Sequence, residues 1–188
     1  MEAAHIQVAK LTYADLCAMP DDRLRHELID GVHYVSPSAS ERHQRIVGEI
    51  FAALHHHLKE RPTGRVYISP LDVVLSDYDV VEPDVLYLTK AQAATQTRIH
   101  LHGAPALAVE VLSPRSRKMD LDLKRRVYDH FGVDEYWIVN PKRDAITVHR
   151  RSAGGPLAVA AELTREAGDS LTTPLLPGFA CPLAVIFA

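Results

Sequence analysis

A glutamate in the middle of an apolar run is the feature that most constrains the fold of this chain. The run is Leu-Ala-Val-Glu-Val-Leu at residues 107–112, and its acid is Glu110. Successive side chains of a β-strand point to opposite faces, so Val109 and Val111 share one apolar layer while Glu110 and Leu112 share the other. A buried carboxylate without a partner is costly. The run therefore predicts a strand whose acid lies on an exposed face, pairs with an arginine, or belongs to a polar site inside the fold.

A lysine stands in the apolar stripe of the helix predicted over residues 118–131. At about 100° per residue, Lys124 projects between Tyr128 and Phe131. A lysine can extend from a partly buried position to the solvent, which is the structural alternative. A purely structural helix would nevertheless carry an aliphatic residue here, so a site shared with buried acids explains Lys124 better.

A second acid, Asp84, follows a proline in the segment Val-Glu-Pro-Asp-Val. Proline removes one backbone donor, so Pro83-Asp84 alone would also fit a plain strand start. Two acids presented from apolar strands can hold a hard divalent cation through oxygen ligands. A lysine beside them can stabilise developing negative charge or orient water. Asp84, Glu110 and Lys124 together therefore favour metal-dependent hydrolysis of phosphodiesters.

The remaining pattern predicts one domain over residues 1–188 of the α/β (α+β) class, with a central mixed β-sheet flanked by helices and an N-terminal hairpin. Asp30-Gly31 favours a type I′ turn in that hairpin. Ser40 suits the N-cap of a helix over residues 41–60, and Gly132 suits the end of the second helix. A helical lead-in is expected first, and the segment around His100-Leu101-His102 is expected to be a loop. The lead-in covers residues 11–24, and strands are expected at residues 65–69, 71–75, 84–88, 106–112, 135–139 and 145–150, with one more short strand in the tail.

Composition and charge argue against several classes of protein. The net charge of −3 and the pI near 6.4 provide no overall basic field that would attract polyanions. Cys17 and Cys181 lie near opposite ends without Cys-x-x-Cys spacing, so neither a disulfide framework nor a zinc knuckle is indicated. No apolar stretch reaches the roughly 20 residues of a membrane span, and no secretory signal is apparent. We therefore expect a cytoplasmic protein without a membrane partner.

The histidines and aromatic residues do not indicate a different enzyme. His55, His56 and His57 are consecutive on a predicted helix and point in different directions, which argues against a zinc hydrolase. Tyr128 and Trp137 are more typical of a core than of a base-stacking surface. The sequence contains no Walker loop, no Gly-x-Gly-x-x-Gly and no Gly-x-Ser-x-Gly elbow.

Pro83-Asp84 followed by Glu110-Val111-Leu112 resembles the signature of the PD-(D/E)XK restriction-endonuclease-like superfamily. The standard pattern places a lysine two residues after the glutamate, where this chain has Leu112. Some members supply the amine from the following helix instead, and Lys124 is placed to do so.

The chain also resembles the Uma-two family of restriction-endonuclease-like proteins, from about residue 11 to residue 187. Each matching segment is short, and the resemblance depends on their number and order. The segments are His26-Glu27-Leu28-Ile29-Asp30-Gly31, His43-Gln44-Arg45-Ile46-Val47, Glu82-Pro83-Asp84-Val85, Val109-Glu110-Val111-Leu112-Ser113-Pro114, Asp120, Lys124, Tyr128, Glu135-Tyr136-Trp137-Ile138-Val139 and Leu176-Pro177-Gly178-Phe179.

This resemblance implies roles for individual residues. Asp84 and Glu110 would ligate Mg²⁺ or Mn²⁺, with the Val111 carbonyl as a third oxygen ligand. Lys124 would stabilise charge or position the attacking water. An acid from earlier in the chain would complete the site, and Glu27 is the candidate; the alternative is that Glu27 anchors the hairpin to a nearby arginine.

A basic, hydroxyl-rich loop follows the strand expected at residues 106–112. Its Ser113, Arg115 and Arg117 are candidates for phosphate contacts, which would fix the position of a substrate without reading its sequence. The alternative is a solvated loop with a serine that caps the next helix. His43, at the start of the helix over residues 41–60, is a candidate neighbour of the site.

The sequence thus predicts a Mg²⁺- or Mn²⁺-dependent endonuclease that hydrolyses DNA phosphodiester bonds. A homodimer is expected, because a double-strand cutter needs two sites and this chain offers one. The alternative is a non-catalytic nucleic-acid-binding or partner-binding module on the same fold. The absence of the strand lysine at Leu112 and the acidic pI favour that alternative, and metal binding would separate the two.

Overall fold

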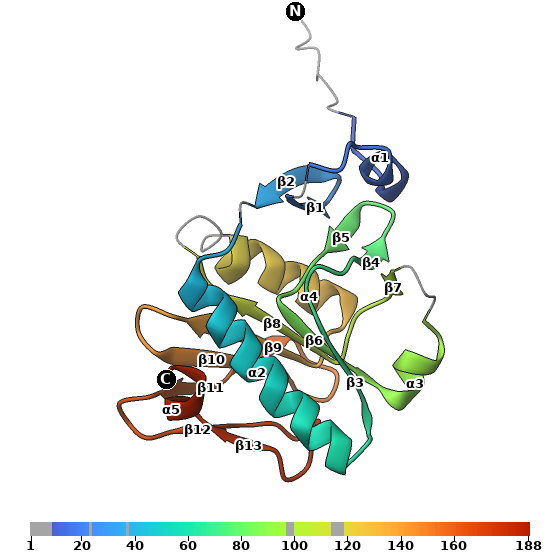
Figure 1. The fold of residues 1–188 in the computed structure, drawn as a ribbon. Coiled ribbons are helices and arrows are strands. Elements are labelled where there is room, and N and C mark those ends of the chain that lie inside the picture. The colour runs from blue at the N-terminus through green and yellow to red at the C-terminus, as the bar shows by residue number, and fades with distance from the viewer. Residues whose placement is uncertain (1–8, 23, 37, 97–99, 114–118) are drawn as a thin grey trace, which may run out of the picture.

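The computed structural model describes residues 9–22, 24–36, 38–96, 100–113 and 119–188. These residues form a six-stranded sheet, a five-stranded sheet and a two-stranded ribbon, together with helices (Figure 1). In chain order the elements are α1 (Tyr13–Cys17), β1 (Arg25–Ile29), β2 (Val32–Ser36), α2 (Glu41–Glu60), β3 (Gly64–Ile68), β4 (Val73–Ser76), β5 (Asp79–Val81), β6 (Val85–Thr89), α3 (Lys90–Ala94), β7 (Leu101–His102), β8 (Leu107–Val111), the π-helix η1 (Met119–Lys124), α4 (Arg125–Phe131), β9 (Glu135–Asn140), β10 (Ala145–Arg151), β11 (Leu157–Thr164), β12 (Ser170–Thr172), β13 (Ala180–Pro182) and α5 (Leu183–Ile186).

The six-stranded central sheet has the order β11-β10-β9-β8-β6-β3. It is mixed, because β8 and β9 run parallel while the other neighbours run antiparallel. Helix α2 crosses one face, and α4 covers the other (Figure 1). Val109 and Val111 of β8 are buried in the core beneath α2, whereas Leu112 packs with Tyr128 of α4. The predicted class, a mixed sheet flanked by helices, is confirmed, and so is the alternation predicted for the apolar run.

The five-stranded sheet, β2-β1-β5-β4-β7, contains the N-terminal hairpin. Asp30 has φ of 50° and Gly31 has φ of 71°, and two successive positive φ angles are typical of a type I′ turn. The predicted hairpin and its turn are therefore confirmed. This sheet lies above the central sheet in Figure 1, so the inner face of β1 looks toward the ends of β6 and β8.

Helix α2 has the predicted bounds and the predicted cap. The Ser40 side chain accepts a hydrogen bond from the His43 backbone N–H at 3.3 Å, as an N-cap serine does. Its apolar stripe is buried against the central sheet, through Ile46, Val47, Ile50, Leu54 and Leu58.

Two predictions about the N-terminal half were wrong. The helical lead-in is only α1, which starts with a capping box between Thr12 and Asp15 and contains no buried residue. Its Tyr13 and Leu16 are only partly buried, packed against the small core cluster of Leu28, Val74 and Val80. The segment predicted as a loop contains β7, whose Leu101 is 4% exposed and pairs in parallel with Val73.

The second helix begins differently from the prediction. Its first turns form η1, a π-helix, and only residues from Arg125 onward are α-helical. Gly132, with φ of 87°, ends α4 as predicted. A π-helical turn is wider than an α-turn and often lies at functional sites. In the described ranges, no helix is both long and apolar enough to cross a bilayer.

Candidate active site

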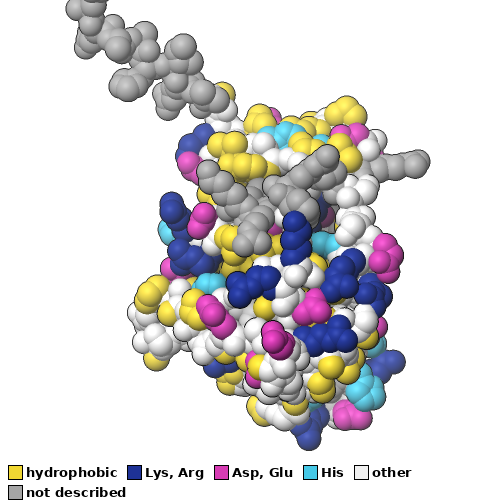
Figure 2. All heavy atoms as spheres, turned by 90° about the vertical axis from the view of Figure 1, so that its left-hand side faces the viewer, with side chains coloured by type: hydrophobic (Ala, Val, Ile, Leu, Met, Phe, Trp, Pro, Cys, Tyr) yellow, Lys and Arg dark blue, Asp and Glu magenta, His cyan; other side chains and the backbone are white. Residues whose placement is uncertain are grey.

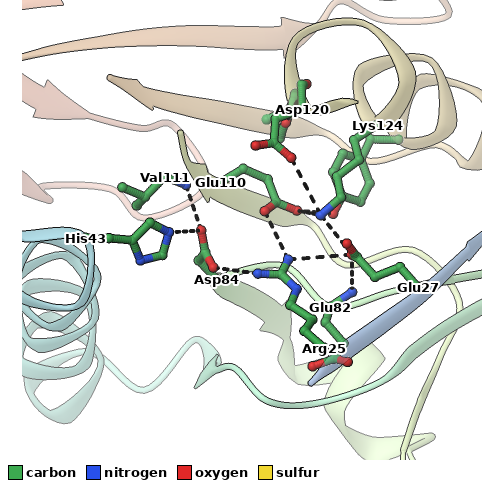
Figure 3. A network of polar contacts seen from close by, with 11 residues as sticks. Arg25, Glu27, His43, Glu82, Asp84, Glu110, Val111, Asp120 and Lys124 are labelled. Atoms are coloured by element: carbon green, nitrogen blue, oxygen red, sulfur yellow. Dashed lines mark hydrogen bonds and ion pairs between the residues drawn. The ribbon is translucent and has the colours of Figure 1, made fainter. Parts of the chain in front are cut away.

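Four separate segments bring charged side chains to one point between the two sheets. Strand alternation places Arg25 and Glu27 on the same face of β1. Val85 pairs with Val109 across β6 and β8, so Asp84 and Glu110 also lie side by side. Figure 3 shows the side chains of these residues converging with that of Lys124 from η1.

Asp84 is held by groups from both sides. Its Oδ2 accepts a hydrogen bond from the Val111 backbone N–H at 2.7 Å and lies 3.3 Å from His43 Nε2, while its Oδ1 lies 2.8 Å from Arg25 Nη1. Burial alone would raise the pKa of Asp84, but these neighbours, His43 and Arg25 above all, lower it to about 2. Asp84 is therefore ionised at neutral pH. Burial would also lower the pKa of His43, and its contact with Asp84 raises it instead.

Lys124 is 1% exposed and lies among acids. Its Nζ is 2.8 Å from Glu110 Oε1, 2.8 Å from Glu27 Oε1 and 3.8 Å from Asp120 Oδ1 (Figure 3). Burial would lower the pKa of Lys124, but Glu110 and Glu27 raise it above the ordinary value. Lys124 therefore does not extend to solvent, and it stays charged inside the fold.

Arg25 belongs to the same cluster, although the sequence did not single it out. Its Nη1 contacts Asp84, its Nη2 lies 3.2 Å from Glu110 Oε2, and the same Nη2 lies 3.5 Å from Glu27 Oε1. Glu27 contacts an arginine, although Arg25 is on the same strand, and it also contacts Lys124, so its role in the site stays a prediction. The signal available in the sequence was the spacing of two between Arg25 and Glu27 on a strand.

The cluster contains more buried acid than base. Five buried carboxylates face Arg25, Lys124 and His43, and they are Glu27, Glu82, Asp84, Glu110 and Asp120. Burial raises the pKa of Glu82 to about 7. Burial also raises the pKa of Glu110 to about 8, against the opposing charges of Lys124 and Arg25. The positive charge of the described residues therefore does not balance all of these acids in ionised form.

The structure brings together most of the residues predicted for the site. These residues contact one another directly or through one neighbour, and they are Asp84, Glu110, Lys124, Glu27, Val111 and His43. Ser113 lines the adjoining cavity, while Arg115 and Arg117 lie outside the described residues. Sequence reasoning missed Arg25, and it named Glu82, Asp120 and Tyr128 in the family resemblance without giving them a place in the site. The last was predicted as a core aromatic, and it is one, but its hydroxyl also donates to Glu110 Oε1 at 2.9 Å.

A large cavity opens onto this cluster. Its volume is about 1710 Å³, and Asp84, Glu110 and Lys124 all line it. Basic side chains at its margin include Arg42, Arg126 and Lys142, which come from α2, α4 and the β9–β10 turn. Figure 2 views the molecule from the side that carries the start of α2, and Lys and Arg side chains gather across the middle of that face among scattered acids.

The donor set fits a divalent cation, although no ready-made coordination cluster exists. Among the residues that the structure describes, no group of three or more His, Cys, Asp or Glu side chains surrounds a common point suited to a metal. Asp84 and Glu110 nevertheless offer two neighbouring carboxylates, the ligand type that Mg²⁺ and Mn²⁺ prefer. The surplus of buried acid provides the charge that such an ion would neutralise.

Comparisons with known proteins agree with this geometry. A family model described as "Uma2: Putative restriction endonuclease" matches residues 12–185. The chain belongs to this family. Membership and fold together support a nuclease function in general, and they confirm the resemblance to the Uma-two family predicted from the sequence.

Two solved structures are similar to the chain. One is a putative nuclease belonging to DUF820 from Anabaena variabilis ATCC 29413, with 16% sequence identity, a TM-score of 0.75, and coverage of 94% of this chain and 97% of that chain. At this identity the similarity establishes the fold alone. The other is the type IIG restriction endonuclease BpuSI, with 13% identity over 63% of this chain and 13% of that chain, and its TM-score of 0.40 supports no argument. Among curated proteins, none matches.

Proposed function

We propose that this protein is a Mg²⁺- or Mn²⁺-dependent endonuclease that hydrolyses DNA phosphodiester bonds. The observation that carries the proposal is the pair Asp84 and Glu110 beside the buried ammonium of Lys124, at the wall of an open cavity. Two carboxylates can hold the cation that metal-assisted phosphodiester hydrolysis uses, and a cationic amine beside them can stabilise the developing negative charge. The family and the fold support the same reaction class.

In this proposal each residue has a defined role. Asp84 and Glu110, with the Val111 carbonyl, would hold the cation, which when bound would lower the pKa of a water and neutralise charge on the phosphate. Lys124 would hold that water in place or stabilise the developing negative charge. Glu27 would keep the Lys124 ammonium charged and pointed at Glu110, which fits its contact of 2.8 Å with Nζ.

His43 would act on Asp84 rather than on substrate. Its ring lies 3.3 Å from Asp84 Oδ2, and the Val111 N–H donates to the same oxygen. These two contacts would fix the orientation of the carboxylate, as groups surrounding metal ligands commonly do. His43 is therefore a positioning residue in this proposal.

The cavity margin favours a polyanionic substrate. A second, smaller hollow shares Arg42, Pro141 and Lys142 with the main cavity and adds Arg143 and Arg165. Its charged residues are four basic side chains and two acids, Asp144 and Glu166, which gives a local excess of two positive charges on a chain of net charge −3. These basic side chains would contact the phosphates of a nucleic acid without contacting its bases. Ser113, at the cavity wall, and the neighbouring Arg115 and Arg117 remain candidates for further phosphate contacts.

Assembly and location are also proposals. A homodimer would place two sites for cutting both strands, and a cytoplasmic location would give access to DNA. We further propose that residues 1–188 act as one domain, with no membrane partner.

The test is cleavage of supercoiled plasmid and of single-stranded DNA with Mg²⁺, with Mn²⁺ and with EDTA. We expect metal-dependent cleavage by the wild type, and no cleavage by Glu110→Gln or Lys124→Ala prepared in parallel. The two variants control for a contaminating nuclease, since a contaminant would survive them. Full activity of Glu110→Gln would contradict the assignment.

A second candidate function is a non-catalytic nucleic-acid-binding or partner-binding module. Leu112, at the position where the PD-(D/E)XK pattern has a strand lysine, favours it, and so does the Arg25 guanidinium that already contacts Asp84 and Glu110. Such a module would bind polynucleotide equally well with EDTA or Mg²⁺, and it would show no saturable Mg²⁺ binding. Calorimetric titration with Mg²⁺, in the absence and in the presence of a short DNA duplex, separates the two functions.

A further inference from the structure

Arg25 occupies the position between the two carboxylates that a cation would need. Its Nη1 lies 2.8 Å from Asp84 Oδ1, and its Nη2 lies 3.2 Å from Glu110 Oε2. Figure 3 shows the guanidinium pointing into the gap between the two acids. One delocalised positive charge therefore bridges the carboxylate pair that the proposed function assigns to a divalent ion.

The other oxygen of each carboxylate already has two partners. Asp84 Oδ2 accepts from the Val111 N–H and faces His43. Glu110 Oε1 accepts from Lys124 Nζ at 2.8 Å and from the Tyr128 hydroxyl at 2.9 Å. Within the described residues, the oxygens left for a cation are the two that Arg25 contacts. A cation that uses both acids must therefore compete with the guanidinium.

The Arg25 guanidinium leaves one of its donor nitrogens without a hydrogen bond within the described part of the chain, unlike an arginine whose role is purely structural. Its Nε has no hydrogen-bond partner among the described residues, although the atom is buried. An arginine has five N–H donors in a rigid fork, and a buried N–H donor that lacks a hydrogen-bond partner costs stability. The Arg25 side chain is 21% exposed and lines the large cavity, so it has room to turn away from the acids.

We propose that Arg25 is the resting counter-ion of the metal site. A divalent cation would bind by displacing its guanidinium from Asp84 and Glu110, and the released guanidinium would turn into the cavity and bind a phosphate oxygen of the substrate. This inference rests on the proposed metal-dependent function. The exchange replaces one positive charge by two in a cluster that has surplus acid, so it is electrostatically favourable once Arg25 finds another anion.

The exchange couples the cation to the phosphate. A phosphate that binds Arg25 in the cavity lowers the cost of removing it from the acids, and a cation at the acids releases Arg25 for the phosphate. Because coupling between two binding sites is reciprocal, each ligand should increase the affinity for the other. Metal would thus bind weakly until a phosphate-bearing substrate is present.

The first experiment measures Mg²⁺ binding by calorimetry, without nucleic acid, to wild type, Arg25→Gln and Arg42→Gln. Arg42 is the matched control, because it lines the same cavity and its loss removes the same charge, but its guanidinium pairs with Asp144. We expect Arg25→Gln to bind Mg²⁺ about tenfold more tightly or better, and Arg42→Gln to remain within about twofold of wild type. Equal gains in both variants would mean that general charge explains the effect, and this would overturn the proposal.

The second experiment follows the guanidinium itself. Arg25→Lys keeps the charge but cannot bridge two carboxylates as the planar fork does, so its Mg²⁺ affinity should lie between those of wild type and Arg25→Gln. The same variant identifies the Nε–Hε resonance of Arg25 in ¹⁵N-labelled wild-type protein. We expect that resonance to shift when diamagnetic Mg²⁺ saturates the site. A resonance that stays unchanged at saturation would overturn the displacement.

The third experiment measures the thermal stability of Arg25→Gln and of wild type, with and without Mg²⁺. Without metal, the variant should unfold at a lower temperature than wild type, because its acids repel one another. If the cation takes the place of the guanidinium, saturating Mg²⁺ should raise the midpoint of Arg25→Gln by more than it raises that of wild type. A deficit that Mg²⁺ does not reduce would mean that Arg25 is purely structural. Absence of Mg²⁺ and Mn²⁺ binding by all variants would overturn the metal-dependent function together with this inference, whereas binding that leaves Arg25 in place would overturn this inference alone.

Discussion

Two buried glutamates occupy neighbouring parallel strands of the central sheet, Glu110 on β8 and Glu135 on β9, and their surroundings differ. Glu135 is 1% exposed, and each of its carboxylate oxygens has a polar partner. The Trp137 indole N–H donates to Oε2 at 2.9 Å, and Arg150 pairs with Oε1. This is one acid with one base, and Glu135 lines neither of the two cavities described above.

Glu110 is equally buried but lies in a crowded cluster. It shares Lys124 with Glu27, it shares Arg25 with Asp84, and it lines the large cavity. Burial of an acid therefore does not by itself indicate a site. What distinguishes Glu110 is its surroundings: several acids share a small number of basic side chains beside an open cavity. Such an arrangement lowers the stability of the fold, and it is typical of functional sites.

The strongest test of this comparison is the pair of variants Glu110→Gln and Glu135→Gln. We expect Glu110→Gln to lose at least about 100-fold of metal-dependent cleavage, because under the proposed function it removes the charge of a metal ligand beside the reacting phosphate. Glu135→Gln should keep the cleavage rate per folded molecule and lose about 1–3 kcal/mol of unfolding free energy, because Arg150 loses its ionic partner while the Trp137 hydrogen bond survives. Rates on plasmid DNA and urea unfolding curves measure the two effects. Equal loss of activity in both variants would remove the distinction.

The second test removes the basic side chain that pairs with each glutamate, Lys124 for Glu110 and Arg150 for Glu135. Lys124→Met should lower the unfolding free energy by about 3–5 kcal/mol, because Glu27 and Glu110 then share a buried region without the ammonium. Arg150→Met should cost less, about 1–3 kcal/mol, because it leaves one buried acid that still accepts from the Trp137 indole N–H, whereas Lys124→Met leaves two. Urea denaturation at constant pH gives both values. A larger loss for Arg150→Met would contradict the contrast.

Several parts of the fold and the site follow from local sequence patterns. Asp30-Gly31 specifies its turn because few residue pairs tolerate two positive φ angles. The apolar periodicity after Ser40 specifies α2. Lys124 was recognisable because a charge in an apolar stripe must meet a partner, and the partner is Glu110.

Other parts depend on contacts that local patterns do not encode. Arg25 contacts Asp84 and Glu110, which are 59 and 85 positions away in the sequence, so its role depends on how the hairpin docks on the central sheet. The segment around Leu101 becomes a strand only because the edge of β4 is available for parallel pairing. No periodicity in residues 118–131 distinguishes a π-helix from an α-helix, because the same side chains cluster in either.

A third test uses pH. The pKa of Glu82 is raised to about 7 and that of Glu110 to about 8, whereas both groups titrate near 4.5 when unfolded. Between pH 4.5 and pH 8 the folded state then binds more protons than the unfolded state, so these two groups contribute stability that is complete below pH 4.5 and is lost as pH rises toward 8. Asp84 acts in the opposite sense: its pKa is lowered to about 2, so its contribution is complete above pH 3.8 and is lost as pH falls through 2.

Thermal unfolding midpoints between pH 5 and pH 8.5 measure this linkage. We expect Glu110→Gln to flatten the decline toward high pH, and Glu135→Gln to leave its slope unchanged. If Mg²⁺ binds the ionised acids as proposed, the increase of the midpoint on adding Mg²⁺ should be larger at pH 8 than at pH 5.5. An equal Mg²⁺ effect at the two values would mean that the ion binds elsewhere.

The smallest expected effect comes from moving the amine to the strand. Leu112 occupies the position where the superfamily pattern has its lysine, and it packs in the same core as Tyr128, on the side of the sheet that carries Lys124. If Lys124 performs the task of that strand lysine, Leu112→Lys in a Lys124→Met background should recover a small part of the cleavage lost by Lys124→Met alone. Leu112→Lys in the wild-type background should gain nothing, since one ammonium already contacts Glu110. Cleavage assays on the two single variants and the double variant decide between a shared site with an exchangeable amine and a lysine that serves only to neutralise Glu27 and Glu110.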